Sequence, residues 1–325
     1  MKKKKLIMPA FFLCIFLFAA FFAVYRYVGV GGKIVKIEAN RDKGFYTEYY
    51  LFIPDTLNAA DQTFLLVECN NTGSVDDNHK THRDAAYNTI RFGQSNRIAR
   101  KLGVPLIIPC FDRPETDWQM YTHALDRDTL LCENGALSRI DRQLNSMIDD
   151  ARTVLRAKNI YVQDKVLLNG FSASGSFANR FAALYPERVA AVAAGGLNSM
   201  AILPMDSLQG HELIYPVGIS DIKQIADLTF QLSAFANVPQ YYYMGAEDEN
   251  DSLPFDDAYS NLERKIITEV LGEDMKVRWE NCQKLYESQS IEAQFHTFQG
   301  IGHETSTEID KDITSFFAQV MDEYK

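Results

Sequence analysis

Ser172 occupies a position where a serine hydroxyl can act as a nucleophile. In residues 167–175, LLNGFSASG, an apolar run leads through small residues into a helical pattern. A sharp turn between a strand and a helix strains its central residue, and only small neighbours such as Gly170 avoid a clash. The serine oxygen then stands clear of the sheet, and the free N–H groups of the following helix favour negative charge beside it. We therefore expect a covalent nucleophile at Ser172.

The segment 170–175, GFSASG, resembles the nucleophile elbow of the α/β-hydrolase superfamily, G-x-S-x-G. It departs from that pattern at Ser174, where glycine is usual, and Gly175 follows directly. In this form it is similar to esterases of the polyhydroxyalkanoate-depolymerase and feruloyl-esterase type. The alternative for the segment on its own is a serine-rich helix start without chemistry.

The resemblance implies a catalytic triad in the chain order serine, acid, histidine. A Gly-x-x-Asp sequence follows a late predicted strand and maps the acid onto Asp248, with Asp251 as the reserve candidate. The alternative is an ordinary solvated acidic loop. His303, bracketed by glycines just before the last helix, matches the catalytic histidine. It would take the serine proton and return it to the leaving group, while the acid stabilises the imidazolium.

Acyl transfer also requires donors for the developing oxyanion. The resemblance places one at the backbone N–H of Ala173, directly after the nucleophile, and a second in the loop after the third strand. That loop is CNNTG, residues 69–73, and it lacks the HGGG form of many lipases. We expect the backbone of Asn71 or Thr72 to serve there, with Gly73 allowing a tight turn.

Other histidines have competing interpretations. His79 and His82 lie near two aspartates and could hold a metal, but a solvated helix start is the favoured interpretation of His-x-x-His in a polar loop. His123, in a loop after a strand, either lines the substrate pocket or packs within the loop. The sequence holds no nucleotide-binding glycine motif and no metal-ligand spacing of cysteines, so we expect no cofactor and no metal.

The element pattern predicts an α/β fold with a mostly parallel sheet of about eight strands and helices on both faces. We expect strands over 33–38, 45–54, 63–68, 104–109, 165–169, 189–194, 238–244 and 293–298. We expect helices over 83–101 and 174–185, one beginning at a Ser138-x-x-Asp141 cap, and a last one with Ile309 and Phe316 on its inner side. Residues 31–325 would form one catalytic domain, in which 200–237 is a lid-like insertion.

Residues 1–30 form a separate segment. Four lysines precede an uncharged apolar run over residues 6–25, which is long enough to cross a bilayer. The lysines favour the cytoplasmic side, so we expect an uncleaved transmembrane signal anchor with an extracytoplasmic domain. A cleaved signal peptide and secretion are the alternative. An exported domain would permit a Cys69–Cys110 disulfide, although buried free thiols are the favoured interpretation.

Charge and motifs together narrow the function. The net charge is −10, and residues 1–30 hold five basic and no acidic residues, so the remainder carries −15. Such a body repels phosphate backbones and excludes nucleic acid as an expected partner. We expect a carboxylic-ester hydrolase that acts on a small-molecule or polymer ester. The alternatives are a serine peptidase or acyltransferase of the same fold, or a catalytically silent hydrolase-like domain that binds at the membrane surface.

Overall fold

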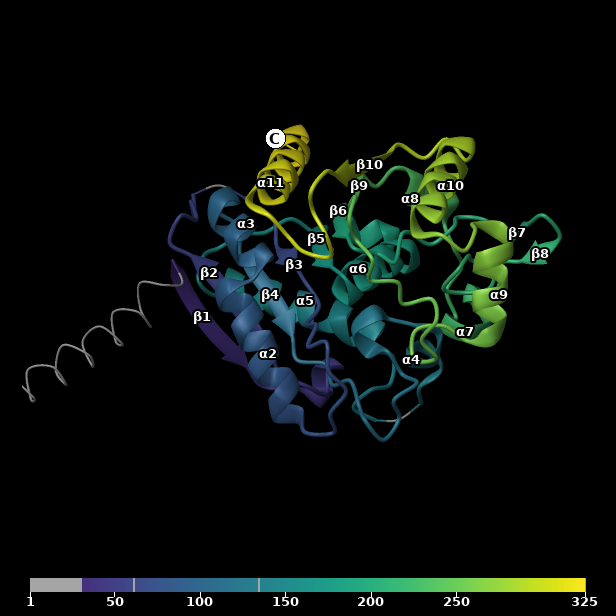
Figure 1. The fold of residues 1–325 in the computed structure, drawn as a ribbon. Coiled ribbons are helices and arrows are strands. Elements are labelled where there is room, and N and C mark those ends of the chain that lie inside the picture. Colours follow the sequence, from purple (N-terminus) through teal and green to yellow (C-terminus); the bar gives the residue numbers. More distant parts are fainter. Residues whose placement is uncertain (1–30, 61, 134, 325) are drawn as a thin grey trace, which may run out of the picture.

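The structure is a computed structural model that describes residues 31–60, 62–133 and 135–324 (Figure 1). Its central element is an eight-stranded sheet with the strand order β1-β2-β4-β3-β5-β6-β9-β10. The strands are β1 (Gly32–Ile37), β2 (Tyr49–Pro54), β3 (Leu66–Val67), β4 (Leu106–Pro109), β5 (Val166–Phe171), β6 (Val189–Gly195), β9 (Gln240–Gly245) and β10 (Ala293–Phe298). All eight predicted strands are present, with some bounds shifted.

The sheet is mostly parallel, as predicted. β2 is antiparallel to both of its neighbours, and every other pairing is parallel. In the central strand β5, Leu168 pairs with Val67 on one side and with Val192 on the other. Such strands are buried on both faces, which is why they read as continuous apolar runs. The carboxyl ends of β3, β5, β6, β9 and β10 therefore meet at one edge of the sheet.

Helices cover both faces of the sheet and enclose two separate apolar cores. Successive residues of β9 show the division, because Tyr241 and Tyr243 join one core and Tyr242 joins the other. On the first face lie α2, α3 and α11, and on the second lie α5 and α6 (Figure 1). These helices are α2 (His79–Phe92), α3 (Gln94–Leu102), α5 (Ile140–Arg156), α6 (Ala173–Leu184) and α11 (Thr307–Glu323).

Two helix predictions are wrong in detail. The single helix expected over residues 83–101 is two helices, because Gly93 adopts an extended conformation with φ −65° and ψ 170° between them. The helix expected to begin at Ser138 is capped by Arg139, in the left-handed region at φ 47°. Asp141 does not complete a capping box, since its carboxylate accepts hydrogen bonds from Arg139 and from Tyr185 Oη.

Two further segments follow β6 and β9. Residues 200–237 form the small hairpin of β7 (Ser207–Leu208) and β8 (His211–Glu212), followed by α7 (Ile222–Ala226) and α8 (Leu232–Ala236). After β9, the chain forms α9 (Asn261–Val270) and α10 (Met275–Ser288), which the sequence analysis does not identify. The short helix α4 (Arg127–Leu131) completes the layer near α7.

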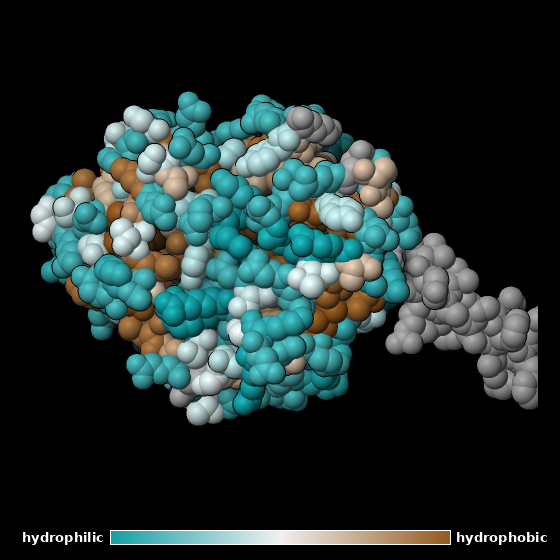
Figure 2. Space-filling view, turned by 180° about the vertical axis from the view of Figure 1, so that it is seen from behind, coloured by the Kyte–Doolittle hydropathy of each residue, from teal (hydrophilic) through white to brown (hydrophobic). Residues whose placement is uncertain are grey.

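The expected membrane anchor, residues 6–25, lies outside the described residues. Among the residues that are described, no helix is long and apolar enough to cross a bilayer. The face in Figure 2 is mostly hydrophilic, with hydrophobic residues in separate small patches. Cys69, Cys110, Cys132 and Cys282 are buried free thiols, so Cys69 and Cys110 form no disulfide.

Candidate active site

Ser172 lies at a strained turn between β5 and α6. Its backbone angles are φ 61° and ψ −128°, a conformation that residues other than glycine rarely adopt. Gly170 makes the turn possible, since a Cβ there would lie 2.2 Å from the backbone oxygen of Ser174. The turn leaves the Ser172 side chain partly exposed at the carboxyl edge of the sheet.

Ser174, the departure from the usual elbow pattern, has a structural use. Its hydroxyl donates to the carbonyl of Phe171 at 2.9 Å and lies 3.0 Å from the N–H of the same residue. The close approach to β6 is made instead at Gly175, where a Cβ would lie 2.6 Å from the oxygen of Gly195. A serine at position 174 therefore fastens the turn, and the glycine required for helix–strand packing stands one residue later.

The loops after β9 and β10 bring Asp248 and His303 into contact. His303 Nδ1 lies 2.9 Å from Asp248 Oδ2, and the Asp248 residue is only 6% exposed. Gly245 allows the two loops to touch, since a Cβ there would lie 2.2 Å from the oxygen of Ile301. The buried carboxylate accepts the Nδ1–H of the imidazole, which leaves Nε2 as the nitrogen able to accept a proton.

Asp251, the reserve candidate for the acid, has a different partner. Its Oδ1 lies 2.7 Å from an Nη atom of Arg278. Arg278 is fully buried on α10, so this ion pair ties the loop after β9 to that helix. The structure thus separates the two aspartates, with Asp248 against the imidazole and Asp251 against a guanidinium.

Gly196 lies close to His303 and lines the same small cavity as Ser172. The ring of Phe171 lies 4.7 Å from that of His303 between centroids, and a Cβ on Gly196 would lie 2.9 Å from His303 Cε1. The cavity that Gly196 and Ser172 line has a volume of about 50 Å³. Only a glycine fits at position 196, where φ is 61°, and the sequence alone does not predict this role of Gly196.

No hydrogen bond joins Ser172 Oγ to His303 among the described residues. The Nε2 atom of His303 is instead 3.2 Å from Nδ2 of Asn250. With Nδ1–H directed at Asp248, Nε2 accepts a hydrogen from the Asn250 amide, an assignment inferred from the hydrogen-bond network. For Nε2 to accept a proton from Ser172, the Asn250 side chain would first have to turn away.

The two expected oxyanion donors lie at the start of α6 and in the loop after β3. Ala173 is the first residue of α6, so its N–H has no acceptor within the helix. After β3, Asn70 anchors the loop by bonding both the N–H and the carbonyl of Phe111. The side chains of Asn71 and Thr72 are used locally, in bonds to Gly73 and Ser74. Their backbone role toward Ser172 stays a prediction.

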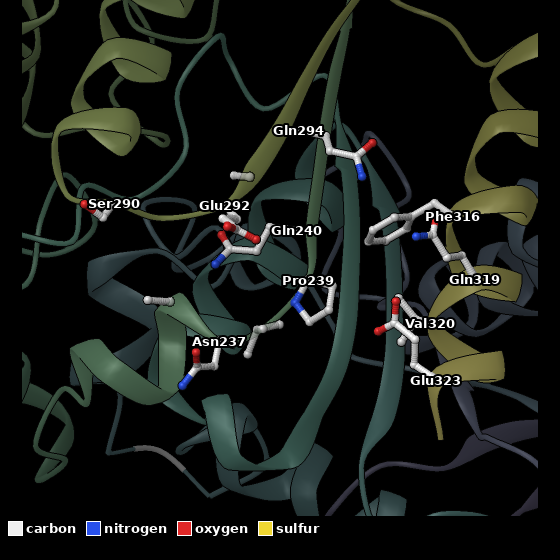
Figure 3. A pocket seen from close by; sticks show the side chains of 13 residues that line it. Asn237, Pro239, Gln240, Ser290, Glu292, Gln294, Phe316, Gln319, Val320 and Glu323 are labelled. Carbon is white, nitrogen blue, oxygen red and sulfur yellow. The ribbon is translucent and has the colours of Figure 1, made fainter. Parts of the chain in front are cut away.

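A larger hollow of about 630 Å³ lies at the opposite edge of the sheet (Figure 3). It is lined by Gln240 and Gln294 at the amino ends of β9 and β10, and by Phe316 and Glu323 of α11. Ligands of open α/β sheets bind at the carboxyl ends of the strands, where Asp248 and His303 follow β9 and β10. No residue between 200 and 237 lines the small cavity beside Ser172. Their role as a lid stays a prediction.

Solved structures share this arrangement of elements. The chain is similar to a poly(3-hydroxybutyrate) depolymerase from Bordetella parapertussis, with a TM-score of 0.56, 16% identity, and coverage of 91% of this chain and 92% of that one. The chain has the α/β-hydrolase fold. An S-formylglutathione hydrolase from Agrobacterium tumefaciens (TM-score 0.54, 11% identity, 90% and 96% covered) and a poly(aspartic acid) hydrolase-1 from Sphingomonas sp. KT-1 (0.53, 15%, 89% and 97%) are also similar.

These likenesses confirm the α/β-hydrolase fold expected from the elbow. No family model and no curated protein matches the chain. The identities are below 25%, so the likeness establishes how the chain folds and leaves its activity to the site itself.

His123 is packed within its own loop. It is fully buried, and its Nε2 lies 2.9 Å from the carbonyl of Phe111 and 3.1 Å from the amide of Asn70. Burial lowers the pKa of His123 to about 3, so the ring is neutral. It helps to hold the loop of Asn70 and does not line the cavity beside Ser172.

The candidate metal histidines point to other partners. His82 Nε2 lies 2.7 Å from the carbonyl of Asp76. His79 lies between two carboxylates, with Nδ1 2.6 Å from Asp112 and Nε2 3.0 Å from Glu48. Within the described part of the chain, no group of three His, Cys, Asp or Glu residues could hold a metal ion.

The pair of carboxylates around His79 predicts a pH-dependent stability. Hydrogen bonds to Asp112 and then to Glu48 raise the pKa of His79 from 6.5 to about 10. Because the pKa is raised in the folded state, the stabilisation is complete below pH 6.5 and is lost as the pH rises toward 10. His79→Gln should lower the free energy of unfolding by on the order of 1 kcal/mol at pH 6, a value discounted for solvent screening of a side chain that is 34% exposed.

Urea unfolding of the wild type and His79→Gln at pH 6 and pH 9.5 measures this difference. We expect it to shrink at the higher pH. A difference of equal size at both pH values would show that His79 stabilises the fold without its charge.

Proposed function

We propose that this protein is a serine hydrolase that cleaves carboxylic esters through Ser172, His303 and Asp248. The observation that carries the proposal is the buried Asp248–His303 pair, 2.9 Å apart, on loops that meet beside the strained turn of Ser172. A carboxylate against Nδ1 gives the imidazole the tautomer that accepts a serine proton at Nε2.

The reaction would proceed in two halves. After Asn250 turns away, the proton of Ser172 Oγ passes to His303 Nε2 as Oγ bonds to the carbonyl carbon of the ester. The N–H groups of Ala173 and of Asn71 or Thr72 stabilise the resulting oxyanion. The C–O bond to the alcohol then breaks, and the alcohol oxygen takes the proton from Nε2, leaving an acyl-serine. Water repeats the sequence and releases the carboxylic acid and free Ser172.

The same three side chains serve peptidases and acyltransferases, which differ in the group that leaves or attacks. Of the three similar structures, two are hydrolases and one is a depolymerase, which supports hydrolysis over transfer. Rates on p-nitrophenyl esters compared with aminoacyl p-nitroanilides separate an esterase from a peptidase.

A fluorophosphonate probe tests the nucleophile directly. We expect it to label the wild type and Ser176→Ala but not Ser172→Ala, because in this proposal His303 activates only the serine at the elbow. Ser176 is a suitable comparison, since it lines the same cavity one helical turn later. Labelling of Ser172→Ala would contradict the proposal by showing that another residue is the nucleophile. Labelling of none of the three proteins would also contradict it and would favour a silent binding domain.

The same labelling experiment tests the proposed location. We propose that residues 6–25 anchor an extracytoplasmic catalytic domain, on the strength of the lysine cluster and the apolar run that follows it. The labelled protein of expressing cells should then stay with the membranes after an alkaline wash. A labelled protein that is released, or secreted in a shorter form, would support a cleaved signal peptide.

A further inference from the structure

A buried arginine lines the cavity beside Ser172. Arg180 lies on α6 eight residues after Ser172, so Ser172, Ser176 and Arg180 follow one another at intervals of one turn on the same side of the helix. Helical side chains lean toward the amino end of the helix, which brings the guanidinium back toward Ser172. All three residues line the small cavity.

Among the described residues, the guanidinium of Arg180 has hydrogen bonds only to neutral oxygen atoms. One Nη atom donates to the carbonyl of Ala124 at 2.8 Å, and the other lies 3.4 Å from the Tyr259 hydroxyl. The residue is 5% exposed. Within the described residues, Arg180 forms no ion pair with a carboxylate, and it is the one charged residue that lines this cavity.

The other buried arginines of the described chain are paired with acids. Arg113 lies 2.5 Å from Asp257, and Arg278 lies 2.7 Å from Asp251. A buried charge is costly unless an opposite charge compensates it, which explains both pairs. Arg180 lacks such a partner at the one place where a substrate can supply it.

Glu263 is the nearby acid that interacts electrostatically with Arg180. It forms no ion pair with Arg180, because its carboxylate accepts the N–H of Ser260 at 2.6 Å as part of a capping box. Burial raises the pKa of Glu263, which disfavours its charged form. Glu263 therefore interacts with Arg180 at a distance, and among the described residues it forms no hydrogen bond or ion pair with the guanidinium.

We propose that Arg180 binds an anionic group of the substrate, so that the preferred ester carries a carboxylate close to the bond that is cleaved. This inference rests on the proposed function of Ser172. The cavity of about 50 Å³ holds only a few heavy atoms, which suits a carboxylate and its neighbouring carbon. Arg180 is thus a specificity-determining residue, and its planar guanidinium matches a carboxylate.

Paired substrates that differ only in charge test this preference. On the acyl side these are mono-p-nitrophenyl adipate and its methyl ester. On the alcohol side they are 4-acetoxybutanoate and methyl 4-acetoxybutanoate, and the reaction is measured by the acetate that is released. For at least one pair, the wild type should show a higher kcat/KM on the charged member. Arg180→Gln should lower the charged-to-neutral ratio of kcat/KM about 10- to 100-fold, and Arg180→Lys should restore part of it.

Arg127→Gln is the matched control, because Arg127 lies outside the cavity and pairs with Asp221. It should keep the wild-type ratio. If neither pair shows a ratio that depends on Arg180 while Ser172 is still labelled, the substrate inference fails and the hydrolase proposal survives. If the wild type is not labelled, both fail.

A measurement on the wild type avoids any folding defect of the variants. Glutarate should slow fluorophosphonate labelling of Ser172, whereas glutaramide at the same concentration and ionic strength should not. Equal effects of the two compounds would overturn the assignment of an anionic subsite to Arg180.

Discussion

Ser172→Ala and His303→Ala are each expected to lower kcat on a p-nitrophenyl ester by roughly 10³- to 10⁶-fold. Without Ser172 no acyl-enzyme forms, and without His303 no group removes the serine proton. The double variant should lose no more than the more damaging single variant, because both side chains act in the same step. Steady-state rates of the three variants, corrected for spontaneous hydrolysis, measure these losses.

Gln94→Ala controls for general damage to the fold. Gln94 is buried at the start of α3 and bonds Asp310 and Asn169, so its loss disturbs packing in the core without removing a proposed catalytic side chain. Losses of Ser172→Ala and His303→Ala that simply add would show that the two residues do not act as a unit. A wild-type rate in either variant would end the case for this nucleophile and base.

The features that can be predicted from the sequence are those that depend on neighbouring residues. The eight strands follow from apolar runs, and the turn at Ser172 follows from the small residues around it. The use of Ser174 could not be foreseen, since its two bonds to Phe171 depend on the exact path of the turn. α9 does carry a local signal, the Ser260-x-x-Glu263 capping box, which the structure shows to be formed.

The parts of the site that were missed depend on contacts between distant segments. Gly196 matters because Phe171 and His303 close around it, and nothing in its own neighbourhood reveals them. Arg180 looks like an ordinary helix residue until the cavity that it lines is known, and until it is known that no described carboxylate forms an ion pair with it. The choice between Asp248 and Asp251 depends on loop geometry, because the two differ in their contacts with His303 and with Arg278 of α10.

Asp248→Asn should lower kcat by on the order of 10⁴-fold while the protein stays folded. The asparagine amide can donate to Nδ1, which moves the imidazole proton to Nε2 and leaves no acceptor for the serine proton. Asp251→Asn is the matched comparison, three residues away on the same loop. It leaves the buried guanidinium of Arg278 without its acid, so it should lower the melting temperature while keeping the rate of the folded enzyme within about tenfold. Measured together, kcat should fall in Asp248→Asn and the melting temperature should fall in Asp251→Asn. A large loss of kcat in Asp251→Asn, with a near-normal kcat in Asp248→Asn, would instead make Asp251 the catalytic acid.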